Sequence, residues 1–114
     1  MQSYQLFINL KKKINVKVVK LGKFIFQFGS YVYTGSAKKK IDKRIKRHLS
    51  KKKNLHWHID YLLNNDAVQI IDTKKSQMTE CNLNKKTKGT IIIGGFGSSD
   101  CNLSCKSHLK FREN

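Results

Sequence analysis

The spacing of apolar and polar residues in the first third of the chain predicts β-strands. The segment "INVKVVKL", residues 14–21, alternates apolar and polar side chains with a period of two, as a half-exposed strand does. Glycine and lysine turns separate it from short apolar runs that predict further strands at residues 4–10, 24–28 and 31–34. Antiparallel hairpins would join these strands with the shortest connections.

The spacing changes to that of a helix after residue 36. Ile41, Ile45 and Leu49 fall on one stripe of a helix expected over residues 37–51, for which Ser36 is a suitable N-cap. Further helices are expected within residues 55–65 and after Ser76, and further strands, the first of them buried, at residues 67–72, 90–93 and 107–111. We therefore predict one α+β domain, residues 1–114, with a mostly antiparallel sheet and about three helices packed on it.

The charge balance narrows the class of partner. The chain has 114 residues, with 24 Lys and Arg against 7 Asp and Glu, a formal net charge of +17. So many positive charges repel one another in a folded molecule, and binding to a polyanion would offset that repulsion. Nucleic acid is the first candidate for this partner and an anionic membrane surface the second. Compositional drift toward lysine would give the same count without such a partner.

The remaining composition bears on the compartment. No apolar run approaches the ~20 residues of a membrane-spanning helix, and residues 1–13 lack the basic segment that opens a signal peptide. Three cysteines, an odd number without a disulfide-rich spacing, favour a reducing compartment. We expect a cytoplasmic protein without a membrane partner.

The basic helix expected over residues 37–51 carries the first candidate site. Arg44 borders the apolar stripe, and His48 lies within about 20° of Ile41 on the helical wheel. Arg47 points away from that stripe. A guanidinium beside the core needs an acceptor, and a phosphate or a structural salt bridge would meet that need equally well. His48 taken alone is a packing residue.

The turn before this helix is the second candidate. Gly35 admits close approach of a ligand, and the free N–H groups expected near Ser36 and Ala37 favour an anion. Tyr31 and Tyr33 differ by two positions, so they share one face of their strand. That face would present phenol hydroxyls beside the turn, although two tyrosines on a strand are ordinarily packing residues.

Together these residues resemble the GIY-YIG nuclease superfamily. "YTGSAKKKIDKRIKRHL" is similar to the second half of its motif, in which a Tyr-x-Gly tripeptide ends a strand and a helix with an arginine and a histidine follows. Tyr4 matches the tyrosine of the first tripeptide, whose glycine is replaced by Gln2. "RIKRHL", "LHWHIDYLL", "EC" and "GFGSSDC…SHL" extend the likeness over nearly the whole chain, to a small, mainly archaeal branch with some members fused to a DNA-repair endonuclease.

What the resemblance implies is phosphodiester hydrolysis assisted by one divalent ion, Mg²⁺ or Mn²⁺. Tyr4 or Tyr33 would help to activate the attacking water, with Arg44 and the metal lowering the phenol pKa. Arg44 would also hold the phosphate, and His48 completes the catalytic set. Glu80 would bind the metal, although a surface carboxylate is the other interpretation of that residue. The substrate-binding candidates are Gly35, Ser36, Lys40 and Arg47.

Three other features have alternatives that stay open. His56 and Asp60 share a helix face and could bind a metal, but a hydrogen bond that anchors the helix is the simpler interpretation. The run "GGFGSSD" could bind phosphate or form a flexible turn. Four residues have zinc-type side chains, Cys81, Cys101, Cys105 and His108. Their spacing differs from that of paired C-x2-C knuckles, so we expect reduced thiols and no zinc.

These expectations lead to a metal-dependent endonuclease that cuts DNA in preference to RNA, with nucleic acid as its partner. A DNA-repair enzyme could be a second partner. The alternatives are a nucleic-acid-binding module that has the fold without the reaction, and a basic accessory subunit of another enzyme. The choice depends on whether the phenols, the guanidinium of Arg44 and the carboxylate of Glu80 lie together.

Overall fold

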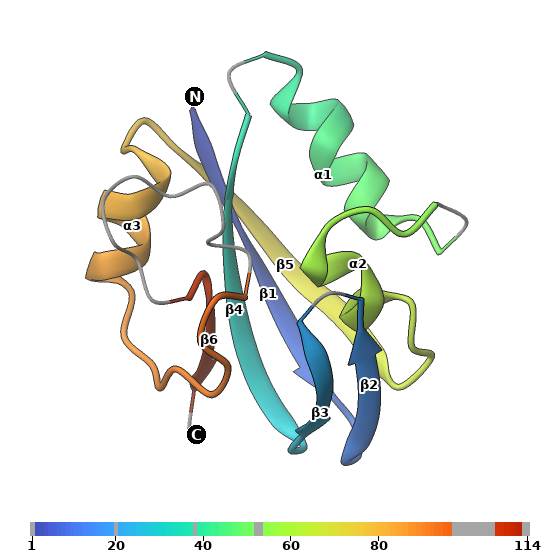
Figure 1. Ribbon diagram of the computed structural model, residues 1–114. Helices are drawn as coiled ribbons and strands as arrows, with labels where there is room; N and C mark the ends of the chain where they lie inside the picture. The colour runs from blue at the N-terminus through green and yellow to red at the C-terminus, as the bar shows by residue number, and fades with distance from the viewer. Residues whose placement is uncertain (1, 20, 38, 52–53, 97–106, 113–114) are drawn as a thin grey trace.

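The computed structural model describes residues 2–19, 21–37, 39–51, 54–96 and 107–112. Its largest element is a four-stranded sheet with the order β5-β1-β4-β6, in which every neighbouring pair is antiparallel. The strands are β1 (Ser3–Leu10), β4 (Gly29–Ser36), β5 (Val68–Ser76) and β6 (Leu109–Arg112). A separate hairpin consists of β2 (Ile14–Val18) and β3 (Gly22–Phe26). The described helices are α1 (Ile41–Leu49), α2 (His58–Leu63) and α3 (Glu80–Lys86), so the predicted α+β class is confirmed (Figure 1).

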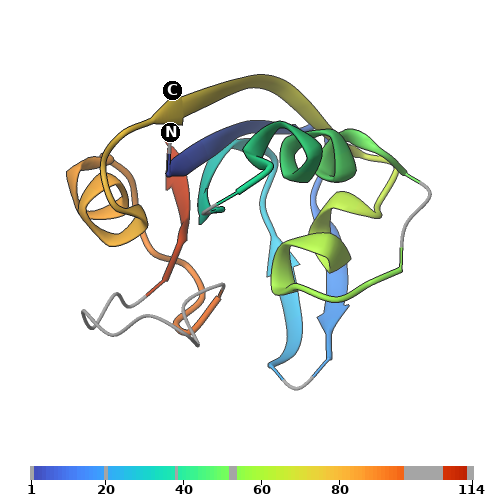
Figure 2. The same ribbon diagram turned by 90° about the horizontal axis from the view of Figure 1, so that it is seen from above.

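The helices lie on two sides of the central strands. In Figure 1, α1, α2 and the β2–β3 hairpin lie together on the right, and α3 lies on the left beside β4. The view from above separates the same two groups (Figure 2). Contacts join α1 to β1, α2 to β2 and β5, and α3 to β4 and β1. The central strand β1 therefore contacts helices of both groups.

One face of β1 supplies the centre of the core. The residues Tyr4, Leu6, Ile8 and Leu10 are each at most 2% exposed, as the period of two along a strand requires. They belong to one hydrophobic cluster with side chains of the hairpin, α1 and α2, among them Val16, Phe26, Ile45, Ile59 and Leu62. The face of the sheet that carries Tyr4 is thus the face on which α1 and α2 pack.

The pairing of β1 with β4 brings distant parts of the chain together. Ser3 pairs with Ser36 and Tyr4 with Gly35, although at least thirty residues separate the members of each pair. The β2–β3 hairpin takes up most of the chain between the end of β1 and the start of β4, and β2 packs against α2. This insertion explains why the segment between the two tyrosine-containing strands is too long for a simple hairpin.

The start and the buried face of α1 differ from the prediction. The helix begins at Ile41 after Lys40, which has left-handed backbone angles (φ 58°), whereas Ser36 is the last residue of β4. β4 continues to Ser36, so the first helical residue comes later than predicted. The prediction that Leu49 is buried is also wrong, because its side chain is 53% exposed at the end of the helix.

The second half of the chain contains three further differences. The predicted buried strand at residues 67–72 is β5, but most of its residues are exposed because it is an edge strand. Residues 90–93 do not form a strand, and only an isolated bridge joins Thr90 to Phe111. The helix α3 begins at Glu80 rather than just after Ser76, with Thr79 as its N-cap: the Thr79 hydroxyl accepts a hydrogen bond from the backbone N–H of Asn82.

An ion pair holds α1 to the start of α2. Arg47 donates to both carboxylate oxygens of Asp60 at 3.0 Å, and the backbone N–H groups of His56 and Trp57 donate to Asp60 Oδ2. Burial by itself would raise the pKa of Asp60, but these hydrogen bonds outweigh it and hold the pKa below its usual value. The interpretation of Asp60 as a helix anchor, rather than as a metal ligand with His56, agrees with these contacts.

No helix in the described ranges is both long enough and apolar enough to cross a membrane.

Removal of the Asp60 carboxylate is expected to loosen α1 and α2. Asp60→Asn should lower the free energy of unfolding by about 2 kcal/mol. This loss is smaller than for a fully buried ion pair, because the Arg47 side chain is 29% exposed to solvent. The pKa of Asp60 is lower in the folded state than in the unfolded state, where it is about 4. The stabilisation is therefore fully present above about pH 4 and is lost as the pH falls through the folded-state pKa. Urea unfolding between about pH 3 and pH 7 measures both effects.

The matched control is Asp42→Asn, which removes the carboxylate of an exposed ion pair with Lys75. It should change the free energy of unfolding by less than ~0.5 kcal/mol. Equal losses in the two variants would contradict the assignment of Asp60 as the anchor.

Candidate functional site

The site is built on the close approach of Tyr4 to Gly35. A Cβ atom at position 35 would lie 2.5 Å from the Cζ and hydroxyl oxygen of Tyr4, so only glycine leaves room for the phenol at this register. Gly35 lies within β4, and it is not a site of positive φ. The predicted close approach at Gly35 is therefore real, but the group that approaches is the side chain of Tyr4.

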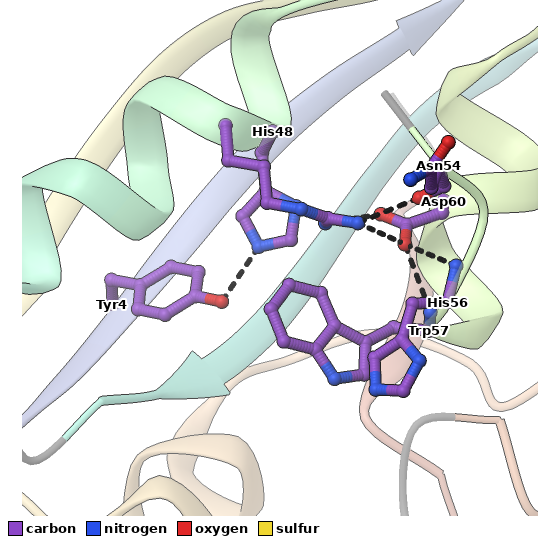
Figure 3. A network of polar contacts seen from close by, with 7 residues as sticks. Tyr4, His48, Asn54, His56, Trp57 and Asp60 are labelled. Atoms are coloured by element: carbon purple, nitrogen blue, oxygen red, sulfur yellow. Dashed lines mark hydrogen bonds and ion pairs between the residues drawn. The ribbon is translucent and has the colours of Figure 1, made fainter.

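The Tyr4 hydroxyl contacts the histidine of α1. The distance from Tyr4 Oη to His48 Nε2 is 2.7 Å, and both side chains are 2% exposed (Figure 3). Their rings also pack at 5.5 Å between centroids. Tyr33 lies against the same imidazole, with a centroid distance of 6.1 Å. Three of the predicted catalytic residues, from β1, β4 and α1, thus surround one buried point.

Arg44 borders this group, as the helical wheel predicts. Its Nη1 donates to the backbone carbonyl of Ser36 at 2.6 Å, and its Cζ lies 4.7 Å from the centroid of the Trp57 ring. The Cζ of Arg47 lies 4.4 Å from the centroid of the same ring. Trp57 thus contacts both guanidinium groups and also packs against His48. A cation over an indole ring is attracted by the ring's electron density, so Trp57 limits where both arginines can lie.

Two of the predicted substrate-binding residues have structural contacts. Arg47, predicted to point away from the core, instead pairs with the buried Asp60 and donates to the carbonyl of Asn54 at 2.8 Å. Ser36 offers its carbonyl to Arg44. The N–H of Ala37, expected to be free for an anion, donates to the carbonyl of Gln2. Lys40 is exposed at the start of α1, where it can reach a ligand.

The electrostatic environment couples the phenols to the other predicted residues. Burial raises the pKa of Tyr4 and of Tyr33, and it outweighs the lowering effect of Arg44 on each. The negative charge of Glu80 adds to the increase at both phenols. Arg44 thus acts on the pKa of both phenols in the expected direction, but its effect is smaller than that of burial. Charges from Arg44 and Glu80 nevertheless act on the same two hydroxyls.

Glu80 lies beside two other residues with metal-binding side chains. Its Oε1 is 3.4 Å from Nδ1 of His108, and one ligand atom each from Glu80, Cys81 and His108 lie within 4.8 Å of one another. The Glu80 side chain is 24% exposed, whereas Cys81 and His108 are buried. This group could hold a metal ion. Glu80 is thus neither a solitary ligand nor a plain surface carboxylate.

Part of the sequence-based zinc candidate lies outside the described residues. This applies to Cys101, Cys105 and the end of the glycine run, residues 97–100. Cys81 is disulfide-bonded, so the expectation of reduced thiols is wrong for this residue. Burial, followed by the charge of Lys110, lowers the pKa of His108, which favours the neutral imidazole at neutral pH.

Sequence reasoning missed two functional neighbours. Trp57 is ten residues or more from each arginine that it contacts, so no helical spacing connects them. The sequence spacing groups His108 with the cysteines and not with Glu80, which is 28 positions away. The fragments "LHWHIDYLL" and "SHL", which carry part of the family resemblance, contain these residues and are the only sequence signal for them.

Comparison with known proteins gives one match. A family model described as a domain of unknown function, DUF123, matches residues 3–114, nearly the whole chain. Searches of curated proteins and of solved structures find no match to the chain.

A methyl group at position 35 is expected to displace the Tyr4 phenol. Gly35→Ala should lower the free energy of unfolding by about 2 kcal/mol, because Tyr4 is enclosed and cannot move without loss of packing. Gly94→Ala is the matched control, since a Cβ there meets nothing within 4 Å and its φ is not positive. Denaturant unfolding measures both, and equal stability of the two variants would contradict the close approach.

Proposed function

We propose that this chain, which belongs to the DUF123 family, is a metal-dependent endonuclease of the GIY-YIG type that hydrolyses phosphodiester bonds in DNA in preference to RNA. The observation that carries the proposal is the hydrogen bond of 2.7 Å between Tyr4 and His48, with Tyr33 and Arg44 beside it. A buried phenol–imidazole pair next to a guanidinium provides the groups that move a proton and hold a phosphate.

The pair of Tyr4 and His48 would act on the attacking water. The raised pKa of Tyr4 keeps its phenol neutral at neutral pH, so the phenol is not a base by itself. In the tautomer that leaves Nε2 of His48 unprotonated, this nitrogen accepts the Tyr4 proton while the phenol oxygen takes a proton from water. The imidazole thus supplies the basicity, and the phenol extends its reach.

Arg44 would hold the phosphate. Its contact with the Ser36 carbonyl uses one donor of a guanidinium that has five, and the Trp57 ring limits the rotation of the group. An arginine held in this way loses little side-chain freedom when a phosphate binds, and its planar fork offers two parallel hydrogen bonds. Trp57 is therefore a positioning residue for Arg44.

The partly exposed carboxylate of Glu80 fits a Mg²⁺ or Mn²⁺ ion that is otherwise bound by waters and substrate phosphate oxygens. Such an ion would polarise the phosphoryl oxygens when it is bound. The negative charge of Glu80 contributes to the raised pKa of both phenols, which relates this carboxylate electrostatically to Tyr4 and Tyr33.

The outer side of α1 would contact the nucleic-acid backbone. Its exposed cations and the turn before it supply a row of positive charge, formed by Lys39, Lys40, Lys43 and Lys46. Such lysines bind phosphates without reading the base sequence. With a net charge of +17, the chain as a whole attracts a polyanion to this surface.

One observation favours a second candidate, the binding module without a reaction. Tyr4 and His48 are each 2% exposed, and a substrate must reach the phenol for catalysis. If no movement uncovers the phenol, the basic surface would bind nucleic acid and cleave nothing. An assay of cleavage and binding with the same variants separates the two candidates.

Nicking of supercoiled plasmid with Mg²⁺ or Mn²⁺ tests the reaction. Arg44→Ala should lower the rate by about 100- to 1,000-fold, as expected for loss of a group that stabilises transition-state charge. Tyr4→Phe and Glu80→Ala should also lower it strongly. Lys17→Ala, which changes an exposed lysine of β2 outside the row of lysines at α1, is the control and should change the rate less than about threefold.

The outcomes distinguish three situations. Equal cleavage by wild type and by Arg44→Ala and Glu80→Ala would indicate a contaminating nuclease and contradict the proposal. No cleavage by the wild type, with nucleic-acid binding intact, would favour the binding module. Loss of cleavage in the variants alone supports the endonuclease.

Binding of DNA should depend steeply on salt. If about six phosphates are contacted, the affinity should fall roughly a thousandfold between about 50 and 200 mM salt. Fluorescence of the single tryptophan, Trp57, which lies among the basic residues of the site, gives a direct readout. An affinity that does not change with salt would contradict a phosphate-binding surface.

A further inference from the structure

Two segments that are distant in sequence form a corner with three metal-binding side chains. Glu80 and Cys81 open α3, which packs on β4, and His108 directly precedes β6, which pairs with β4. One ligand atom from each of the three lies within 4.8 Å of the others. Tetrahedral zinc holds its ligand atoms about 3.3–3.8 Å apart, and the 3.4 Å between Glu80 Oε1 and His108 Nδ1 already falls in that range.

The buried imidazole of His108 indicates that a ligand is missing at this corner. Its side chain is 1% exposed, and neither ring nitrogen has a hydrogen-bond partner within the described part of the chain. The contact of Nδ1 with Glu80, at 3.4 Å, is too long for a good hydrogen bond. Buried polar atoms are nearly always satisfied, because burial without a partner removes their hydrogen bonds to water and replaces them with nothing. A metal ion bound to the imidazole would satisfy this residue.

The donor set selects the class of metal. A carboxylate oxygen, an imidazole nitrogen and a thiolate sulfur together suit Zn²⁺ and similar ions, whereas Mg²⁺ prefers oxygen alone. The two negative charges of Glu80 and the Cys81 thiolate would balance a divalent cation in a buried place. Such compensation matters in a chain with so large an excess of positive charge.

The disulfide of Cys81 makes this site dependent on redox state. A sulfur atom in a disulfide is not a thiolate and does not bind zinc as one. Reduction by a dithiol transfers two electrons and two protons to the disulfide and oxidises the dithiol to its own disulfide. Cys81 is then a thiol, which releases its proton when the metal–sulfur bond forms.

We propose that, after reduction of the Cys81 disulfide, Glu80, Cys81 and His108 bind one zinc-class ion with a water as fourth ligand. The disulfide and the metal exclude one another, so the corner is a redox-dependent metal site. Glu80 also belongs to the proposed nuclease site, but this inference does not rest on that function, because the test below measures metal binding without a substrate.

The experiment titrates the full chain with Co²⁺ and then displaces the cobalt with Zn²⁺, followed by optical absorption. Protein is reduced with a dithiol, freed of the reductant without air, and compared with oxidised protein. We expect one ion per reduced chain, with the visible bands of tetrahedral cobalt and a sulfur-to-metal band in the near ultraviolet. The oxidised chain should bind at least ~100-fold more weakly and lack the sulfur band.

Variants identify the ligands. Cys81→Ser should remove the sulfur band, and Glu80→Gln and His108→Gln should each weaken zinc binding by about 100-fold or more. Glu80→Gln keeps the test valid if the buried His108 variant fails to fold, because Glu80 is partly exposed. His56→Gln, which changes an exposed histidine outside the corner, is the matched control and should bind normally.

A variant with Cys101→Ser and Cys105→Ser leaves Cys81 as the only cysteine of the chain. It should bind cobalt with the sulfur band whether or not a reductant has been used. Loss of binding in this variant would assign the metal to the other cysteines and overturn the proposal, as would absence of the sulfur band in the reduced wild type.

Arg44→Ala separates this inference from the proposed function. The variant should bind zinc as the wild type does while it fails to cleave DNA. A chain that cleaves DNA and binds no zinc contradicts only the redox-dependent metal site. A chain that binds zinc and never cleaves contradicts only the nuclease.

Discussion

Tyr4 and Gly35 face each other across the two central strands, and any side chain at position 35 would occupy the place of the Tyr4 phenol. This constraint fixes the direction of the Tyr4 hydroxyl, which then meets His48 on α1. The packing of α1 on β1 and the polar contact at the centre of the site therefore have the same origin. A strand pairing shifted by one residue would turn Tyr4 to the other face and remove both.

The residues around this contact are held in place by one acidic residue of a strongly basic chain, Asp60. Asp60 is completely buried, and it binds Arg47 and the backbone N–H groups of the two residues before α2, His56 and Trp57. Arg47 in turn lies over Trp57, which also contacts Arg44. An arginine used for structure thus helps to place another that remains available to an anion.

The two sides of the central strands carry different chemistry. On the side of α1 and α2, hydroxyl, imidazole and guanidinium groups suit proton transfer and phosphate binding. On the side of α3, the carboxylate, thiol and imidazole of Glu80, Cys81 and His108 suit a metal. The charge of Glu80 acts on Tyr4 and Tyr33, so the two sides are not independent. Occupation of the metal corner would change the charge next to both phenols.

The sequence by itself determined the local features that depend on short-range periodicity and on charge. The alternation of residues 14–18, the apolar face of β1 and the helical stripe with Arg44 at its border predicted strands, helix and class of fold, because neighbours in sequence set these patterns. Tertiary structure alone decided the start of α1, the exposure of β5, the burial that raises the pKa of Tyr4, and the meeting of Glu80 with His108. These depend on the loop lengths and on contacts between residues far apart in the chain, for which a sequence pattern holds no distance information.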